Sequence, residues 1–254
     1  MLKIDLQGRI ALVTGASGEL GRVIARTLAE CGADVAVHYH GNREKAEQTA
    51  EAVRALGRRA CVVNADVTDM ASVQAMQQEI REQLGVVSLV VANAVIQYRW
   101  TTILEQDLAD FRSQFDSCAM QTVHLAKAFV PDMIAQKYGR IVAINTECAA
   151  LAEPGVGAYT AGKRALDGVV RVLAKEVGEN GITVNQVAPG WTISEKDRRE
   201  HTEAAPDYDR TVPLRHRGTD EDIANMTAFL LSDLAGFTTG AYIPVSGGRV
   251  MPAI

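Results

Sequence analysis

Short apolar runs alternate along the chain with longer stretches in which apolar residues recur every three or four positions. The first run, residues 9–13, precedes a stretch with Leu20, Ile24 and Leu28 at helical spacing. Repetition of this order is typical of an α/β protein with a parallel sheet. We expect strands at residues 9–13, 34–39, 61–64, 88–92, 140–145, 182–187 and 242–245.

Two of the helical patterns are unusually long. Residues 107–136 carry apolar positions that include Phe111 and Phe129, and we expect a helix that packs on the sheet or on a neighbouring subunit. Residues 159–179 have an apolar arc wide enough to face both the sheet and a partner chain. No repeat or linker divides the sequence, so we expect a single domain over residues 1–254.

The composition is that of a globular protein that can bury a sizeable core. Hydrophobic residues make up 47% of the 254 positions and charged residues 22%. The net charge of −5 argues against nucleic-acid binding, which usually needs a basic face. The four cysteines lack CxxC or His-linked spacing, so we expect reduced thiols and no metal site. No apolar stretch approaches a membrane span or forms a leader before the first strand, so we expect a cytoplasmic protein with no membrane partner.

A glycine-rich turn, TGASGELG at residues 14–21, joins the first predicted strand to the first predicted helix. Its glycines let the backbone approach a pyrophosphate, and a helix N-terminus favours an anion. The pattern alone also fits a plain tight turn, but the flanking strand and helix favour nucleotide binding. The cofactor-binding residues expected here are Gly15, Ser17, Gly18, Glu19 and Leu20.

The end of the second predicted strand bears on the choice between NADP(H) and NAD(H). The position that would carry an acidic group for the ribose of NAD holds Tyr39. His40, Asn42 and Arg43 offer hydrogen bonds or positive charge to a 2′-phosphate, which favours NADP(H), with NAD(H) as the other possibility. Alternatively, Arg43 starts the exposed face of the next helix.

Polar residues also follow the third and fourth strands, at the edge where parallel sheets bind ligands. After the third strand come Asp66 and Val67, and Asp66 would accept a hydrogen bond from an adenine amino group. Alternatively, Asp66 or Thr68 only caps the next helix. The turn after the fourth strand, which we expect to line the cofactor cleft, is Asn93, Ala94 and Val95.

Tyr159 and Lys163 stand four residues apart at the head of a helical pattern, so on a helix they leave the same face. A phenol has a pKa of about 10, and an ammonium beside it favours the phenolate and lowers that pKa. The pair can therefore exchange a proton with a carbonyl oxygen. Thr146, at the end of the fifth strand, offers a hydroxyl to the same oxygen. These residues predict a site that reduces a carbonyl or oxidises an alcohol.

Residues 193–213, which follow the sixth strand, are polar and charged, and we call them the lid segment. A stretch of this length inside a domain is typical of a lid over a substrate. The alternative is a disordered surface insertion.

The order of these motifs resembles the short-chain dehydrogenase/reductase family, over about Leu6 to Met251. TGASGELG resembles its TGxxxGxG turn, NAV its NAG motif and YTAGK its YxxxK, and APGW and the late SGG complete the set. Within the family the chain is most similar to the beta-ketoacyl-acyl carrier protein reductase type. The resemblance implies a doubly wound (Rossmann) domain, with a seven-stranded parallel sheet flanked by helices on both faces. It also implies a homotetramer, or a dimer, built partly on the two long helices.

The resemblance also implies roles for single residues. Tyr159 would be the proton donor, Lys163 would bind the nicotinamide ribose and lower the tyrosine pKa, and Thr146 would orient the carbonyl. The residues that would meet the nicotinamide are Pro189, Gly190, Thr192 and Ser194.

Four positions depart from the family pattern. Glu19 replaces a glycine, where a carboxylate beside a pyrophosphate is unfavourable unless it turns away. Val95 replaces the glycine of NAG, and Thr146 replaces serine. Cys118 stands where a proton-relay asparagine is expected, and a thiol is a weak hydrogen-bond partner.

Two hypotheses of function follow. The leading one is an NADP-preferring carbonyl reductase or alcohol dehydrogenase that acts on a small molecule, because Tyr159 and Lys163 are both present. The alternative is a cofactor-binding protein with weak or no catalysis, a sensor or an assembly subunit, because Glu19, Val95 and Cys118 alter the cleft.

Overall fold

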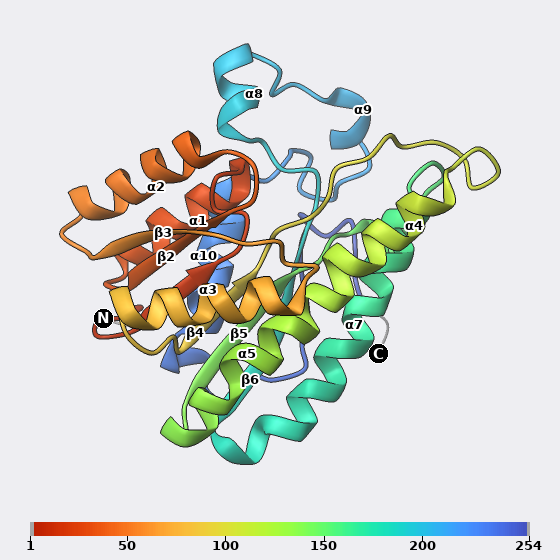
Figure 1. Ribbon diagram of the computed structural model, residues 1–254. Helices are drawn as coiled ribbons and strands as arrows, with labels where there is room; N and C mark the ends of the chain where they lie inside the picture. The colour runs from red at the N-terminus through yellow and green to blue at the C-terminus, as the bar shows by residue number, and fades with distance from the viewer. Residues whose placement is uncertain (1–2, 253–254) are drawn as a thin grey trace.

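Seven parallel strands form one sheet through the centre of the molecule, in the order β3-β2-β1-β4-β5-β6-β7 (Figure 1). The computed structural model describes residues 3–252, and residues 1, 2, 253 and 254 of the predicted domain lie outside the described residues. The predicted α/β fold and its seven-stranded parallel sheet are confirmed. The strands are β1 (Ile10–Val13), β2 (Asp34–Tyr39), β3 (Ala60–Asn64), β4 (Leu89–Ala92), β5 (Gly139–Ile144), β6 (Ile182–Pro189) and β7 (Tyr242–Val245).

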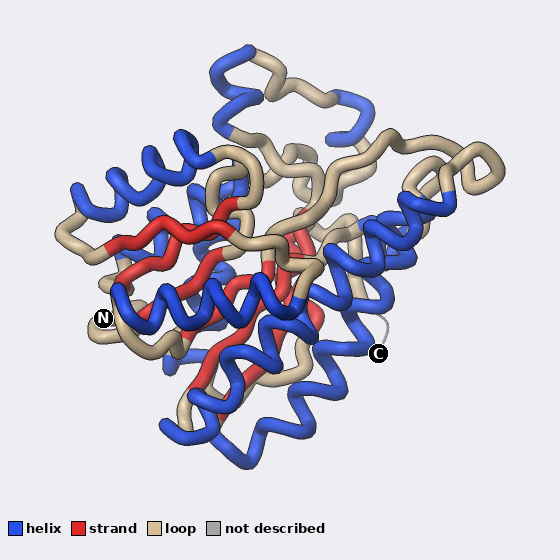
Figure 2. The backbone as a smooth tube through the Cα atoms, in the orientation of Figure 1, coloured by secondary structure: helices blue, strands red, loops and turns tan. Residues whose placement is uncertain are grey.

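Helices cover both faces of the sheet, so that the strands lie between two helical layers (Figure 2). One layer consists of α1 (Glu19–Glu30), α2 (Arg43–Ala55) and α10 (Asp220–Leu231). The other consists of α3 (Met70–Gln83), α5 (Gln121–Gln136) and α7 (Gly157–Val177). Shorter helices are α4 (Leu108–Gln114), α6 (Cys148–Leu151), α8 (Glu195–Glu200) and α9 (Pro206–Asp209). Single 3-10 turns span Gly178–Asn180 and Asp233–Ala235.

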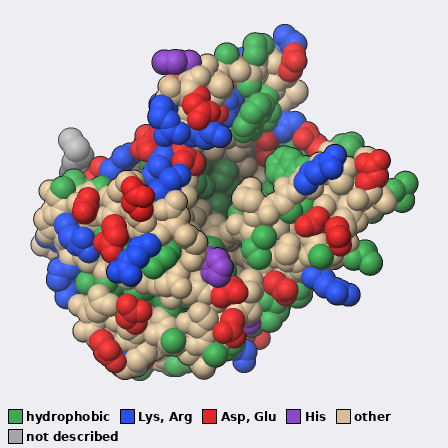
Figure 3. Space-filling view, turned by 45° about the horizontal axis from the view of Figure 1, so that its top comes forward, with side chains coloured by type: hydrophobic (Ala, Val, Ile, Leu, Met, Phe, Trp, Pro, Cys, Tyr) green, Lys and Arg blue, Asp and Glu red, His purple; other side chains and the backbone are tan. Residues whose placement is uncertain are grey.

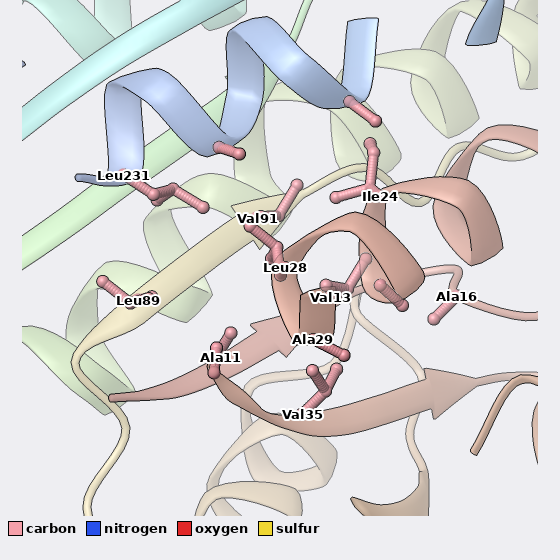
Figure 4. Close-up of a cluster of buried hydrophobic side chains, with 14 of the residues drawn as sticks. Ala11, Val13, Ala16, Ile24, Leu28, Ala29, Val35, Leu89, Val91 and Leu231 are labelled. Atoms are coloured by element: carbon pink, nitrogen blue, oxygen red, sulfur yellow. The ribbon is translucent and has the colours of Figure 1, made fainter. Parts of the chain in front are cut away.

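Strands β1 and β4 are unbroken apolar runs because both of their faces are buried. In β1, Ala11 and Val13 face the layer of α1 and α10, whereas Ile10 and Leu12 face the opposite layer. Figure 4 shows the first of these clusters, where side chains of β1, β2 and β4 pack against Leu28 of α1 and the end of α10.

The long helical pattern at residues 107–136 forms three segments. Between α4 and α5 lies a π-helical turn, Phe115–Met120, which widens the helix by one residue for each hydrogen bond. The single helix that we expect there is therefore interrupted.

The lid segment contains two short helices, α8 and α9. Both stand apart from the two helical layers that cover the sheet, at the top of the view in Figure 1. The alternative of a disordered insertion is wrong for this segment, because Ser194 and Asp197 form a reciprocal capping box at the start of α8. No helix within residues 3–252 is long and apolar enough to cross a membrane.

Candidate active site

A cleft of about 770 Å³ lies beyond the carboxyl ends of the strands. Figure 3 shows the surface hollowed beneath the lid segment, with hydrophobic side chains on the floor of the hollow. β1 lies between β2 and β4, so the order of the strands reverses here, as expected for a ligand site in a doubly wound sheet. The sequence-predicted residues that line it are Gly15, Ser17, Gly18, Glu19, Leu20, His40, Asn42, Asp66, Val67, Asn93, Ala94, Val95, Thr146, Tyr159, Lys163, Pro189, Gly190 and Thr192.

The glycine turn approaches its neighbours too closely to hold larger residues. Gly15 has a φ of +64°, and a Cβ placed on Gly21 would lie 2.3 Å from the Gly15 carbonyl oxygen. Helix α1 begins at Glu19, so its first turn faces the cleft. A backbone packed this tightly against a helix N-terminus suits the pyrophosphate of a dinucleotide.

Hydrogen bonds tie the glycine turn to the turn after β4. The Thr14 hydroxyl donates to the side-chain oxygen of Gln121 at 2.7 Å and accepts from the backbone N–H groups of Asn93 and Ala94 at 2.8 and 3.0 Å. The Asn93 side chain donates back to the Thr14 carbonyl at 2.8 Å. The two turns therefore form one rigid wall of the cleft.

His38, which the sequence analysis missed, braces the glycine turn from β2. Its Nδ1 accepts from the Gly15 N–H at 3.0 Å, and its Nε2 lies 3.0 Å from the Ala65 carbonyl oxygen. An Nδ1 that accepts and an Nε2 that donates define one neutral tautomer. Burial lowers the pKa of His38 from its ordinary value to about 4. The only sequence signal is a histidine inside an apolar strand.

The residues predicted to meet the adenosine ribose separate into two groups. His40 and Asn42 line the cleft, and the Asn42 side chain also accepts from the backbone N–H of Lys45 as the cap of α2. Tyr39 and Arg43 lie outside the lining. The Arg43 side chain is 73% exposed and pairs with Glu47 at 3.6 Å, as expected for the first residue of an exposed helix face.

Asp66 lines the cleft as a carboxylate. Its Oδ1 accepts from the backbone N–H and the hydroxyl of Thr68 at 2.8 and 2.7 Å, and these bonds hold its pKa below the ordinary value. The cap of α3 is Asp69, which accepts from two backbone N–H groups of the first turn. The alternative that Asp66 or Thr68 caps this helix is therefore wrong.

Tyr159, Lys163 and Thr146 line the same cleft as the glycine turn. Burial raises the pKa of the Tyr159 phenol, the Cys118 and Cys148 thiols add to the rise, and a hydrogen bond with Thr146 opposes it. The Lys163 ammonium lies 5.6 Å from the tyrosine ring centre and donates to the Ile144 carbonyl at 2.6 Å. The net shift of the phenol pKa is upward, opposite to the lowering that we expect from Lys163.

Two aromatic residues after β4 position Tyr159. The Tyr98 hydroxyl accepts from the backbone N–H of Tyr159 at 2.8 Å. The Trp100 ring stacks on the Tyr159 ring at 6.1 Å between centres, with 22° between the planes. Ile96 and Gln97, from the same segment, line the cleft.

Cys118 lies below the cleft, in the π-helical turn, and its side chain is buried. Its Sγ lies 3.9 Å from the side-chain oxygen of Gln114. The same turn packs on the helix that carries Tyr159, because a Cβ on Gly162 would lie 2.5 Å from the Gln114 carbonyl oxygen. Cys118 therefore sits close to α7, the helix that carries Tyr159, without lining the cleft.

The lid segment is fastened beside the predicted nicotinamide site. Ser194 lies outside the lining, where its hydroxyl accepts from the Asp197 N–H in the capping box of α8. The Tyr208 hydroxyl accepts from the Trp191 N–H at 2.8 Å and donates to the buried Glu147 at 2.9 Å. Arg249 donates to the same Glu147 oxygen at 2.7 Å. No sequence signal marks this group, because its members are distant along the chain.

Other lining residues were also missed by the sequence analysis. Three of them follow predicted strands, three lie within the carboxyl-terminal parts of predicted strands, and two lie on helices, so a parallel sheet accounts for the place of the first six. They are Gly21, His38, Gly41, Thr68, Ile96, Ser117, Ile144 and Asn145. Among residues 3–252, no group of three or more His, Cys, Asp or Glu side chains is placed to hold a metal ion.

Comparison with known proteins identifies the family. A family model described as enoyl-(acyl carrier protein) reductase matches residues 15–249. The 3-oxoacyl-acyl-carrier-protein reductase FabG of Staphylococcus aureus is 36% identical over 241 residues, which cover 95% of this chain and 98% of that protein.

Two solved structures share the whole fold. The promiscuous reductase LugOII, which catalyses keto-reduction at C1 in lugdunomycin biosynthesis, is 30% identical with a TM-score of 0.89, and the match covers 97% of this chain and 99% of that one. A candidate gluconate dehydrogenase from Agrobacterium tumefaciens is 28% identical with a TM-score of 0.91, and the match covers 100% of both chains. The chain belongs to the short-chain dehydrogenase/reductase family.

Proposed function

We propose that this protein is an NAD(P)(H)-dependent oxidoreductase that interconverts a small-molecule carbonyl and its alcohol, with Tyr159 as the proton donor. The observation that carries the proposal is that Tyr159, Lys163 and Thr146 line one cleft with the glycine turn. Relatives named as reductases of a 3-oxoacyl group and of a keto group support the carbonyl as the reacting group.

The chemistry divides between cofactor and protein. A bound nicotinamide supplies or accepts the hydride. The protein holds the carbonyl oxygen between the Thr146 hydroxyl and the Tyr159 phenol, and Tyr159 gives its proton to that oxygen as negative charge develops. The phenol has an ordinary pKa of about 10, which burial raises, so it carries its proton at neutral pH. Lys163 lies beside the phenol, and its positive charge stabilises the phenolate that remains after Tyr159 has given up its proton.

For the cofactor we propose NADP(H) rather than NAD(H). The support is that no acidic side chain ends β2, where Tyr39 stands, and that His40 and Asn42 line the cleft and can donate to a 2′-phosphate. Among the described residues that line the cleft, Lys163 is the one lysine or arginine. We therefore expect a moderate preference, measured as the ratio of Kd values for NADH and NADPH by calorimetry.

The test is NADPH oxidation with a panel of ketones, aldehydes and beta-keto esters, in the wild type and in Tyr159→Phe. We expect the variant to bind NADPH and to lose turnover by about 10²- to 10⁴-fold, because the phenol proton is absent. Tyr138→Phe is a matched control, since Tyr138 precedes β5 at the opposite end of the sheet. Equal turnover in Tyr159→Phe and the wild type would overturn the proposal.

A second candidate function is a cofactor-binding protein with weak or no catalysis. Cys118, which stands at the position of the family's relay asparagine, favours this candidate. Its thiol is buried, and its hydrogen-bond contact with Gln114 is long, at 3.9 Å. Calorimetry separates the two candidates. Tight NADPH binding with no turnover on the whole panel supports the second, and strong turnover excludes it.

The proposal includes a homotetramer, or a dimer, in which the lid segment covers the substrate within each single-domain subunit. Exposed apolar side chains at Leu104, Leu108 and Phe115, on and beside α4, support a subunit contact. Light scattering measures the mass of the assembly, and cell fractionation tests the expected cytoplasmic location.

A further inference from the structure

Glu19 departs from the family's glycine at the first position of α1, and one oxygen of its carboxylate makes two contacts. The Oε2 atom accepts a hydrogen bond from the backbone N–H of Lys196 at 3.1 Å, and the carboxylate pairs with the Arg22 guanidinium. These contacts hold the carboxylate toward the lid segment, beside the positive charge of Arg22.

The ion pairs continue from α1 into the lid segment. Arg22 Nε lies 2.7 Å from Glu195 Oε2, and Arg26 Nη1 lies 3.3 Å from Glu195 Oε1. Glu195 is the first residue of α8, so two arginines of α1 hold the start of that helix. In Figure 3, side chains of both charges gather where the lid segment meets the body of the molecule.

The lid segment has a second attachment of a different kind. The side chain of Arg217, which follows the lid segment, is 1% exposed and donates to the Thr192 carbonyl at 2.7 Å and the Glu203 carbonyl at 3.2 Å. The Glu19, Arg22 and Glu195 side chains are 32%, 22% and 32% exposed. Water reaches the Glu19 contacts, whereas the contacts of Arg217 are sealed, so the Glu19 contacts break first.

We propose that Glu19 is a positioning residue that latches α8 of the lid segment to the first turn of α1, at the mouth of the cofactor cleft. Arg22 and Glu195 complete the latch, and Arg217 is the buried pivot about which the segment opens. Glu19 lines the cleft, so the latch must open for a dinucleotide to enter or leave. This last consequence rests on the proposed function, whereas the latch itself does not.

Amide hydrogen exchange across residues 195–200, in the protein without nucleotide, tests the latch directly. Glu19→Gln removes the ion pair with Arg22, and Glu19→Gly also removes the acceptor for the Lys196 N–H. We expect exchange to rise by about threefold in the first variant and about tenfold in the second, as for partly exposed charge pairs and charge-assisted bonds. Salt should raise exchange in the wild type, and raise it less in Glu19→Gly, where only the ion pairs of Glu195 with Arg22 and Arg26 remain.

Glu44→Gln is the matched control, because Glu44 also stands in the first turn of a helix, α2, and is exposed. Its exchange across residues 195–200 should equal that of the wild type. Glu195→Gln should raise exchange like Glu19→Gln, and the double variant should add little, because both belong to one set of contacts. Exchange in both Glu19 variants within twofold of the control would overturn the latch.

Stopped-flow release of NADPH measures the consequence for the cofactor. We expect release to be about threefold to tenfold faster in Glu19→Gly than in the wild type, in proportion to the opening of the lid segment. Equal release rates, with exchange raised, would overturn the link between latch and cofactor. Absence of NADPH binding in the wild type would instead count against the proposed function. The latch would still be tested by amide hydrogen exchange, which is measured without nucleotide.

Discussion

The backbone N–H of Gly15 donates a hydrogen bond to Nδ1 of His38 at 3.0 Å, so a buried imidazole supports the glycine turn that lines the cleft. Protonation of Nδ1 would place an N–H against an N–H. The neutral ring is therefore part of the folded structure, and its titration must appear in the stability of the protein.

We expect stability to fall as the pH drops below 6.5. An unfolded histidine has its ordinary pKa of 6.5, whereas the pKa of His38 is about 4 in the folded protein. Between these pH values the unfolded state binds more protons than the folded state. The free energy of unfolding therefore falls by at most about 1.4 kcal/mol for each pH unit of acidification. Urea denaturation at several pH values measures the slope.

His38→Asn should remove this contribution, because an amide does not titrate. His201→Asn is the matched control, since His201 is exposed and its left-handed backbone suits asparagine. An unchanged slope in His38→Asn would show that other groups are responsible.

Gly21→Ala should damage the nucleotide site. The new methyl group would lie 2.3 Å from the Gly15 carbonyl oxygen, a backbone atom that cannot move without shifting the turn. We expect a loss of about 1–3 kcal/mol in the free energy of unfolding and a much weaker affinity for NADPH. Gly168→Ala, at an exposed helical position with no atom within 4 Å, should leave both unharmed.

Lys163→Met should lower turnover by about 10²-fold, because it removes the positive charge that stabilises a phenolate on Tyr159. The side chain is buried, and methionine retains most of its apolar contacts. Lys175→Met, on the exposed face of the last turn of the same helix, serves as the control. Comparable turnover in the two variants would exclude a catalytic role for Lys163.

Tyr208→Phe should loosen the lid segment. The variant removes the hydroxyl that donates to Glu147 and accepts from the Trp191 N–H, so a buried carboxylate keeps only its bond from Arg249 and an amide loses its acceptor. We expect a loss of about 1–3 kcal/mol in the free energy of unfolding. Thermal unfolding measures the loss, and a midpoint equal to that of the wild type would contradict it.

The sheet could be predicted because its signals are local. Strands such as β1 and β4 are short apolar runs, and β7 occurs at the predicted positions, Tyr242–Val245. The π-helical turn could not be predicted from residues 107–136. The carbonyl of Gln114, the residue before the turn, lies against Gly162 of α7, and no pattern within the turn records that long-range contact.

Much of the cleft could be predicted for a similar reason. The carboxyl ends of parallel strands meet at one edge, so residues after each strand converge whatever their identity. Arg43 follows a strand but lies outside the cleft lining, because it begins a helix and its side chain is exposed to solvent beside Glu47.

The sequence by itself determined the parallel fold, the nucleotide-binding turn and the spacing of Tyr159 and Lys163, because each depends on residues close together in the chain. Only the tertiary structure decided the protonation of the site and the attachment of the lid segment. Burial raises the pKa of Tyr159, and Glu19 bonds to Lys196, 177 residues away. Burial and long-range contact are properties of the packed chain, so no local pattern contains them.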